Sequence, residues 1–122
     1  MTPREIVDTY YTLANGGEWD RWSDLFAAGA VVDEQLAGRI EGRETLRAAV
    51  KGFPELYRRF TNTPRHVLVD GEQAAVISHI SAVTPDGRRI EADVANYFRF
   101  EGGLIAYMAN FHDSVPFTGG AT

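Results

Sequence analysis

The sequence predicts an α+β fold, in which helices pack on one face of a mostly antiparallel sheet. In the first half of the 122-residue chain, apolar residues recur mainly at helical spacing. From residue 60 onward they alternate with polar residues, and glycine-containing turns separate the alternating segments. Helices followed by a run of strands are typical of the α+β class, and the length favours a single domain over residues 1–122.

Three helices are predicted in the first half. Thr2, Pro3 and Glu5 have the spacing of a capping box at the start of the first helix. The apolar stripes of the three helices are, in order, Ile6, Tyr10, Leu13 and Ala14; Trp19, Trp22 and Phe26; and Leu46, Ala49, Val50 and Phe53. Residues 15–17, Asn-Gly-Gly, end the first helix, and Pro54 ends or kinks the third.

Five strands are predicted. The first is short, and its alternation puts Ala30, Val32, Glu34 and Leu36 on one face. The others cover residues 64–70, 73–84, 88–100 and 104–113, and the turns between them contain Gly71, Gly87, Gly102 and Gly103. These turns predict hairpins, so the longer strands should form an antiparallel meander.

One polar residue interrupts the apolar face of the segment IEADVANYFRF, residues 90–100. Asn96 stands there among Ile90, Ala92, Val94, Phe98 and Phe100. An unpaired buried amide costs about 1–3 kcal/mol, so either the protein or a ligand must satisfy it. The same alternation in the neighbouring strands predicts an inner set of Ile77, His79, Ser81, Val83, Leu104, Ala106, Met108, Asn110 and His112. Polar groups set in apolar walls are typical of a binding pocket.

Two groups of site residues follow from this predicted binding pocket. The candidate catalytic residues are Tyr10, Glu34, His79, Asn96 and His112. The candidate ligand-binding residues are Phe26, Ile77, Ser81, Val94, Phe98, Met108 and Asn110. Each also has a structural interpretation, since buried tyrosines and histidines are often core residues and a glutamate near a strand end is often solvated.

Composition excludes several function classes. The chain has no cysteine, a net charge of -5 and a pI of about 5.1, which disfavour thiolate chemistry and nucleic-acid partners. No third ligand stands at metal spacing near His112, and no glycine-rich phosphate loop is present, so we expect neither a metal nor a cofactor. No apolar run reaches the length of a membrane span and the first residues lack a secretory signal, so a cytoplasmic protein without membrane contact is expected.

The opposite face of the sheet predicts a homodimer. By the same alternation that face carries Val76, Ile80, Ala95, Tyr97, Tyr107 and Phe111. It is more apolar than a solvated face normally is, and a second copy of the chain would cover it. Scattered surface apolar residues are the alternative.

The chain resembles the nuclear transport factor 2-like superfamily, in its ketosteroid isomerase and SnoaL-like polyketide cyclase branch. The resemblance lies in the segments WDRWSDLFAAGAVV, IEGRETLRAAV and ANYFRFEGGLIAYMANFHD, and it extends over nearly the whole chain. It implies a cystatin-like fold in which three N-terminal helices and a curved sheet form a cone-shaped pocket.

The resemblance also implies roles for three residues. The tyrosine of the isomerase falls on Tyr10, its general-base aspartate falls near Glu34, and its second oxyanion-hole acid falls on Asn96. In that isomerase a tyrosine and a neutral carboxylic acid stabilise the oxyanion, and an amide can donate in the same way. His79 and His112 resemble instead the histidines of dehydratases and cyclases of this fold.

The expected function is an enzyme that forms an enolate or similar oxyanion from a small apolar carbonyl compound. Glu34 or a histidine would take the proton, and Tyr10 and Asn96 would hold the oxyanion. An isomerase, a cyclase and a dehydratase all fit this chemistry. The alternatives are a non-catalytic ligand-binding or dimerisation module of the same fold, and an epoxide hydrolase, which would need an Asp-Arg-Asp set on the inner face.

Overall fold

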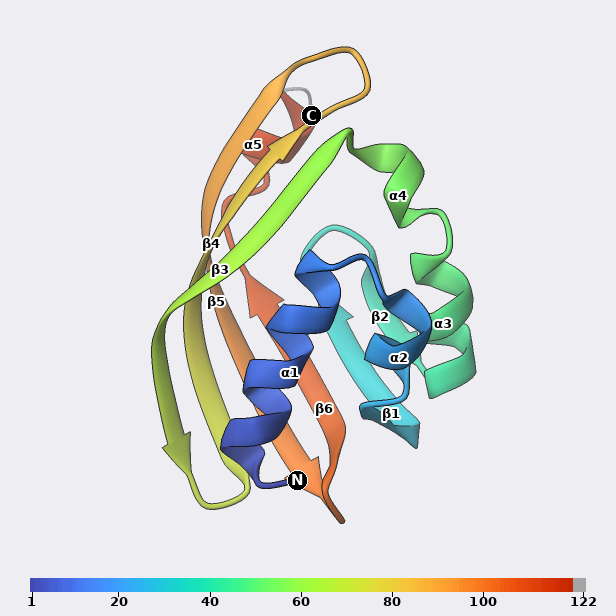
Figure 1. Cartoon of the computed structure of the whole chain (residues 1–122), viewed down its shortest axis with the longest axis vertical. Helices are drawn as coiled ribbons and strands as arrows, with labels where there is room; N and C mark the ends of the chain where they lie inside the picture. Colours follow the sequence, from blue (N-terminus) through green and yellow to red (C-terminus); the bar gives the residue numbers. More distant parts are fainter. Residues whose placement is uncertain (120–122) are drawn as a thin grey trace.

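The structure, a computed structural model, describes residues 1–119 and contains a six-stranded sheet with helices along one face (Figure 1). The helices are α1 (Pro3–Asn15), α2 (Trp19–Ser23), α3 (Arg43–Val50), α4 (Phe53–Leu56) and α5 (Val115–Thr118). The strands are β1 (Phe26–Glu34), β2 (Gly38–Glu41), β3 (Arg59–Asp70), β4 (Gln73–Val83), β5 (Arg89–Glu101) and β6 (Leu104–Phe111). Their order is β2-β1-β6-β5-β4-β3, and only the β1–β6 pair is parallel. The predicted α+β class is confirmed.

The first helix begins as its sequence predicts. The Thr2 hydroxyl accepts from the Glu5 amide at 3.2 Å, and the Glu5 carboxylate accepts from the Thr2 amide at 2.9 Å. One side of α1 is buried against the sheet, and it carries Ile6, Val7, Tyr10, Tyr11, Leu13 and Ala14. Because α1 crosses the inner face of the long strands, it brings Tyr10 over the sheet (Figure 1).

Several boundaries differ from the prediction, and among them β3 begins at Arg59 rather than at residue 64. Phe26 is the first residue of β1 rather than the end of the second helix, and β1 ends at Glu34 in a turn that leads into the unpredicted strand β2. The predicted third helix is divided into α3 and α4, and Pro54 lies in the first turn of α4. The glycine-rich and proline-containing connections set these boundaries. Apolar periodicity does not predict them, because it does not distinguish a short helix from a short buried strand.

The face predicted for β5 is confirmed, whereas the face predicted for β4 is wrong. Every second residue of β5 from Ile90 to Phe100 is buried. In β4, however, the paired register aligns Val76 with Asn96 and Ser78 with Val94, so Val76 and Ser78 face inward. The outward set is therefore Ile77, His79, Ser81 and Val83, while Val76 and Ile80 belong to the inner face.

A bulge changes the face of the first residues of β6. Phe100 pairs with Ile105, but the preceding Arg99 pairs with Tyr107, so Ala106 is an extra residue on β6. Leu104 and Ala106 therefore lose the inward phase predicted for them, and Ile105 is buried instead. After the bulge the predicted phase holds, and Met108 faces the core.

The described part of the chain has neither a membrane-spanning helix nor a cluster of metal ligands. No helix among residues 1–119 has the length and apolar character that crossing a membrane requires. Within the same residues, no three side chains of histidine, cysteine, aspartate or glutamate lie close enough together to hold a metal ion.

Candidate functional site

A cavity of about 310 Å³ lies between the helices and the inner face of the sheet. Helices α1 to α5, the β1–β2 turn and strands β1 to β6 each contribute residues to its wall. The turns at the ends of the long hairpins do not line it. Four of the predicted catalytic residues line it: Tyr10, Glu34, Asn96 and His112. Three of the predicted ligand-binding residues also line it: Val94, Met108 and Asn110. The volume lies at the lower end of the range of small-molecule sites.

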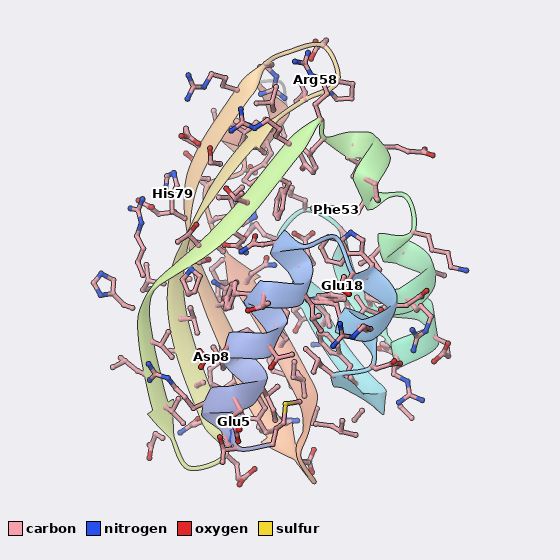
Figure 2. The ribbon with its side chains drawn as sticks, in the orientation of Figure 1. Glu5, Asp8, Glu18, Phe53, Arg58 and His79 are labelled. Carbon is pink, nitrogen blue, oxygen red and sulfur yellow. The ribbon has the colours of Figure 1, made fainter. Side chains whose placement is uncertain are left out.

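The structure excludes five predicted residues from the cavity wall. His79, Ile77 and Ser81 lie on the outer face, and Ile77 is 41% exposed there. Figure 2 shows His79 projecting from the sheet on the side away from the helices. Phe26 and Phe98 are fully buried, but they belong to the packed core behind the wall.

His79 has partners of its own on the outer face. Its Nδ1 lies 2.8 Å from the carboxylate of Asp93, and its Nε2 lies 3.7 Å from Glu91. The hydrogen bond from His79 lowers the pKa of Asp93 below its usual value. His79 is thus part of an exposed polar cluster on the other side of the sheet, and the catalytic role predicted for it is wrong.

Tyr10 lies in the aromatic part of the wall. Its ring is 5.1 Å from that of Phe98 and 5.4 Å from that of Trp22, and only 7% of the residue is exposed. Burial raises the pKa of Tyr10 well above that of a free phenol, and the nearby Tyr11 and Glu34 raise it further. Tyr10 therefore stays protonated at neutral pH and presents a hydrogen-bond donor.

Glu34 is the last residue of β1 and is held by the turn that follows. Its Oε2 accepts hydrogen bonds from the backbone amides of Leu36, at 2.8 Å, and of Ala37. These bonds fix the direction of the carboxylate and use only one of its oxygens. Oε1 remains for a ligand in the cavity.

The two asparagines that face each other across β5 and β6 use opposite ends of their amides. The Nδ2 of Asn96 donates to the Val76 carbonyl at 3.1 Å and to the Ser78 hydroxyl at 2.9 Å, so its free atom is the acceptor Oδ1. The Oδ1 of Asn110 accepts from the Gln35 amide at 2.9 Å, which leaves its Nδ2 as a donor without a partner within residues 1–119. The protein therefore satisfies the buried amide of Asn96, and the geometry offers the oxyanion-donor role to Asn110 instead.

His112 follows β6 at the rim of the cavity. Its Nδ1 lies 2.8 Å from the backbone carbonyl of Asp113, which can only accept, so Nδ1 carries the proton in the neutral ring. The ring packs against Phe117 of α5, with 4.7 Å between the centroids. Nε2 consequently carries a lone pair and can accept a proton.

Sequence reasoning missed much of the wall. The aromatic residues Trp19, Trp22, Phe53, Tyr57, Phe60 and Phe117 all line the cavity, together with Asn62. Trp22 Nε1 and Asn62 Oδ1 are buried and have no hydrogen-bond partner within residues 1–119. Helical spacing places Trp22 and Phe53 on apolar stripes, but it does not distinguish a core position from a cavity position.

A wider hollow of about 420 Å³ lies elsewhere, on the outer face of the sheet. It is lined by Arg39, Arg99, Glu101, Tyr107 and several small residues of β1 and β6. Arg39 is already bonded to both oxygens of Asp33, at 2.8 and 2.9 Å. The hollow contains none of the residues that line the inner cavity, so we place the candidate site inside.

Comparisons with known proteins agree with the fold. An uncharacterized PhzA/B-like protein of Pseudomonas aeruginosa is 30% identical, over 91% of this chain and 84% of the relative. A candidate polyketide cyclase from Pseudomonas putida has the same fold, with a TM-score of 0.88 at 20% identity over 100% of this chain and 99% of that one. A ketosteroid isomerase-like protein from Catenulispora acidiphila, in complex with trimethylamine, has a TM-score of 0.81 at 18% identity over 91% and 86% of the two chains.

The match to a family covers most of the chain. Residues 7–108 match the SnoaL-like domain, a segment that runs from α1 into β6 and contains Tyr10, Glu34 and Asn96. Because the match spans far more than half of the sequence, the chain belongs to the SnoaL-like family.

Proposed function

We propose that the protein is an enzyme that uses general acid/base chemistry to form an enolate or similar oxyanion from a small carbonyl compound. One observation carries this proposal: two proton acceptors, Glu34 and His112, line the same apolar cavity as a phenol that stays protonated, Tyr10. A base and a hydrogen-bond donor in one apolar cavity form the arrangement that proton abstraction next to a carbonyl requires.

In the proposed step, Oε1 of Glu34 takes a proton from the carbon next to the carbonyl group. The electron pair of that C–H bond moves to the carbonyl oxygen, which becomes the oxyanion. The Tyr10 hydroxyl and the free Nδ2 of Asn110 supply hydrogen bonds to this oxygen. Because Oε2 is held by two backbone amides, the base keeps its direction without help from the substrate.

The second proton acceptor, His112, would act in the step that follows formation of the enolate. An isomerase returns the proton to another carbon, a cyclase forms a ring from the enolate, and a dehydratase protonates a departing hydroxyl. His112, with its free Nε2 at the rim, is placed to carry a proton between two positions of a bound substrate. All three reactions share the same first step.

A non-catalytic binding module is the second candidate function, and one observation favours it. The hydrogen bonds from Leu36 and Ala37 to Glu34 also stabilise the β1–β2 turn, so the carboxylate has a structural use without any reaction. In that case the cavity would bind its ligand and release it unchanged.

Proton exchange separates the two functions without knowledge of the product. A panel of enolisable ketones is incubated with the protein in D₂O, and loss of the α-proton signal is followed by NMR. The proposed enzyme should accelerate exchange of at least one ketone well above the buffer rate. Binding of the same ketones with no exchange above the buffer rate would contradict the proposal and favour the module.

We also propose that two copies of the chain associate through the outer face of the sheet. Ile77 and Phe111 are 41% and 58% exposed there, beside the rings of Tyr97 and Tyr107, which are 6.2 Å apart. Burying this surface in a second copy would remove the apolar area from water.

Sedimentation equilibrium at micromolar concentration should therefore give about twice 13.5 kDa. Tyr97→Asp should give a folded monomer, because it places a charge in the centre of the interface, whereas Tyr97→Phe keeps the ring and should remain a dimer. A wild-type protein that stays monomeric at every concentration would remove this proposal.

A further inference from the structure

The formal charge of the cavity wall is one-sided. Among its lining residues within 1–119, Glu34 has the one carboxyl group, and no lysine or arginine is present. The adjacent Asp33 differs in this respect. It points to the outer face, where Arg39 holds both of its oxygens and the Tyr107 hydroxyl donates to it. Of two neighbouring carboxylates, the outer one has a cationic partner and the one in the cavity has none within residues 1–119.

Aromatic side chains that line the same cavity as Glu34 form a continuous wall. The ring of Phe53 lies 4.8 Å from Trp19, 5.2 Å from Tyr57 and 4.8 Å from Phe60, and Trp19 lies 5.2 Å from Trp22. Figure 2 shows Phe53 between the helices and the sheet. The faces of such rings carry partial negative charge, so a group of them attracts an organic cation while also burying its apolar surface.

The carboxylate and the aromatic wall act on the same space. Burial is the largest cause of the raised pKa of Tyr57 and of Tyr10, and the charge of Glu34 raises both further, whereas Arg88 acts in the opposite direction on Tyr57. The negative potential of Glu34 thus reaches both parts of the cavity. The same potential repels an anionic ligand and stabilises a cationic one, more strongly than at an exposed surface.

From the unpaired carboxylate and the ring wall, we infer that the natural ligand is an organic cation, whose ammonium group lies between Glu34 and the rings of Phe53 and Tyr57. If the proposed function holds, the substrate is a carbonyl compound that also carries an amine. The binding preference itself does not depend on catalysis. A charged nitrogen in the cavity would supply the counter-ion that Glu34 lacks.

Choline and its neutral isostere 3,3-dimethylbutan-1-ol test this inference, because they differ only in a nitrogen that replaces a carbon. Both tryptophans of the chain line the cavity, so their fluorescence reports binding directly. The wild-type protein should bind choline about 10-fold more tightly or better. In Glu34→Gln this preference should fall to about 2-fold or less, while Glu41→Gln, an equal change of charge on an exposed β2 residue, should keep it.

A second variant keeps the test valid if the carboxylate change disturbs the β1–β2 turn. Phe53→Leu removes one aromatic face but leaves an apolar side chain, so it should weaken choline severalfold and the isostere much less.

The inference is overturned if the neutral isostere binds as tightly as choline, if Glu34→Gln keeps the preference, or if choline does not bind at millimolar concentration. Any of these results leaves ketone exchange, and with it the proposed function, unaffected. Conversely, a cation preference in a protein that exchanges no ketone proton would support the inference and contradict the enzyme.

Discussion

Replacing Glu34 with glutamine is expected to lower kcat on any ketone that the protein turns over by about 10²- to 10⁴-fold. Glutamine keeps the shape of the side chain, and its Oε1 can still accept from the Leu36 and Ala37 amides. It cannot accept a proton from carbon. For an uncharged ketone KM should change little, because the lost interaction is made mainly in the transition state. Steady-state kinetics of the purified variant measures both constants.

The pH profile distinguishes Glu34 from His112 as the base. If Glu34 is the base, the fall of kcat/KM at low pH should disappear in Glu34→Gln and persist in His112→Gln. The opposite pattern would assign the base to His112, whose Nε2 is free. Glu41→Gln serves as the control for the loss of one negative charge. A wild-type rate in both site variants would contradict acid/base catalysis in this cavity.

The parts of the fold that the sequence predicts well are those with contrast between two faces. In β5, charged or polar residues alternate with apolar ones, and the buried face follows as expected. In β4, small and apolar residues occupy both phases, with Val76 and Ile80 on one and Ile77 and Val83 on the other. In such a strand, alternation with a period of two does not show which face is buried. The pairing of β4 with β5 determines the buried face. The misplacement of His79 follows directly.

The candidate site shows the same division. Tyr10, Glu34 and His112 are found in the cavity because each lies on, or directly after, an element whose phase is marked by apolar neighbours. The direction of a hydrogen bond is a different matter. Whether Asn96 presents its nitrogen or its oxygen depends on the Val76 carbonyl and Ser78, which come from another strand in a register that the sequence does not reveal.

The missed aromatic wall has a further cause. Trp19 and Phe53 are far apart in the sequence and lie on two short helices, α2 and α4. Their contact, with 4.8 Å between the ring centroids, depends on how these helices pack. Helical spacing identifies an apolar side of each helix, but it does not show whether that side fills the core or borders a cavity.

Replacing Tyr10 with phenylalanine should lower kcat by about 10²- to 10³-fold, because it removes a donor to the oxyanion. The ring and its packing on Phe98 and Trp22 remain. No hydrogen bond within residues 1–119 is among the causes of the raised pKa of Tyr10, so removing the hydroxyl breaks none. The free energy of unfolding should therefore change little. The decline of rate at high pH should also be altered if it reflects ionisation of this phenol. Kinetics and thermal unfolding are measured on the same preparation.

Tyr11→Phe is the matched control for this prediction, one residue further along the same helix. The Tyr11 hydroxyl is buried, its one polar contact within residues 1–119 is a poorly aligned one with the Ser78 side chain, and the residue does not line the cavity. Removing this hydroxyl should leave kcat unchanged and should change the free energy of unfolding little, because the loss of a weak contact is offset by the loss of a buried polar group. An equal loss of kcat in both variants would show that packing of α1, rather than the Tyr10 hydroxyl, supports the reaction. A loss confined to Tyr10→Phe, with normal unfolding, assigns the donor to that hydroxyl.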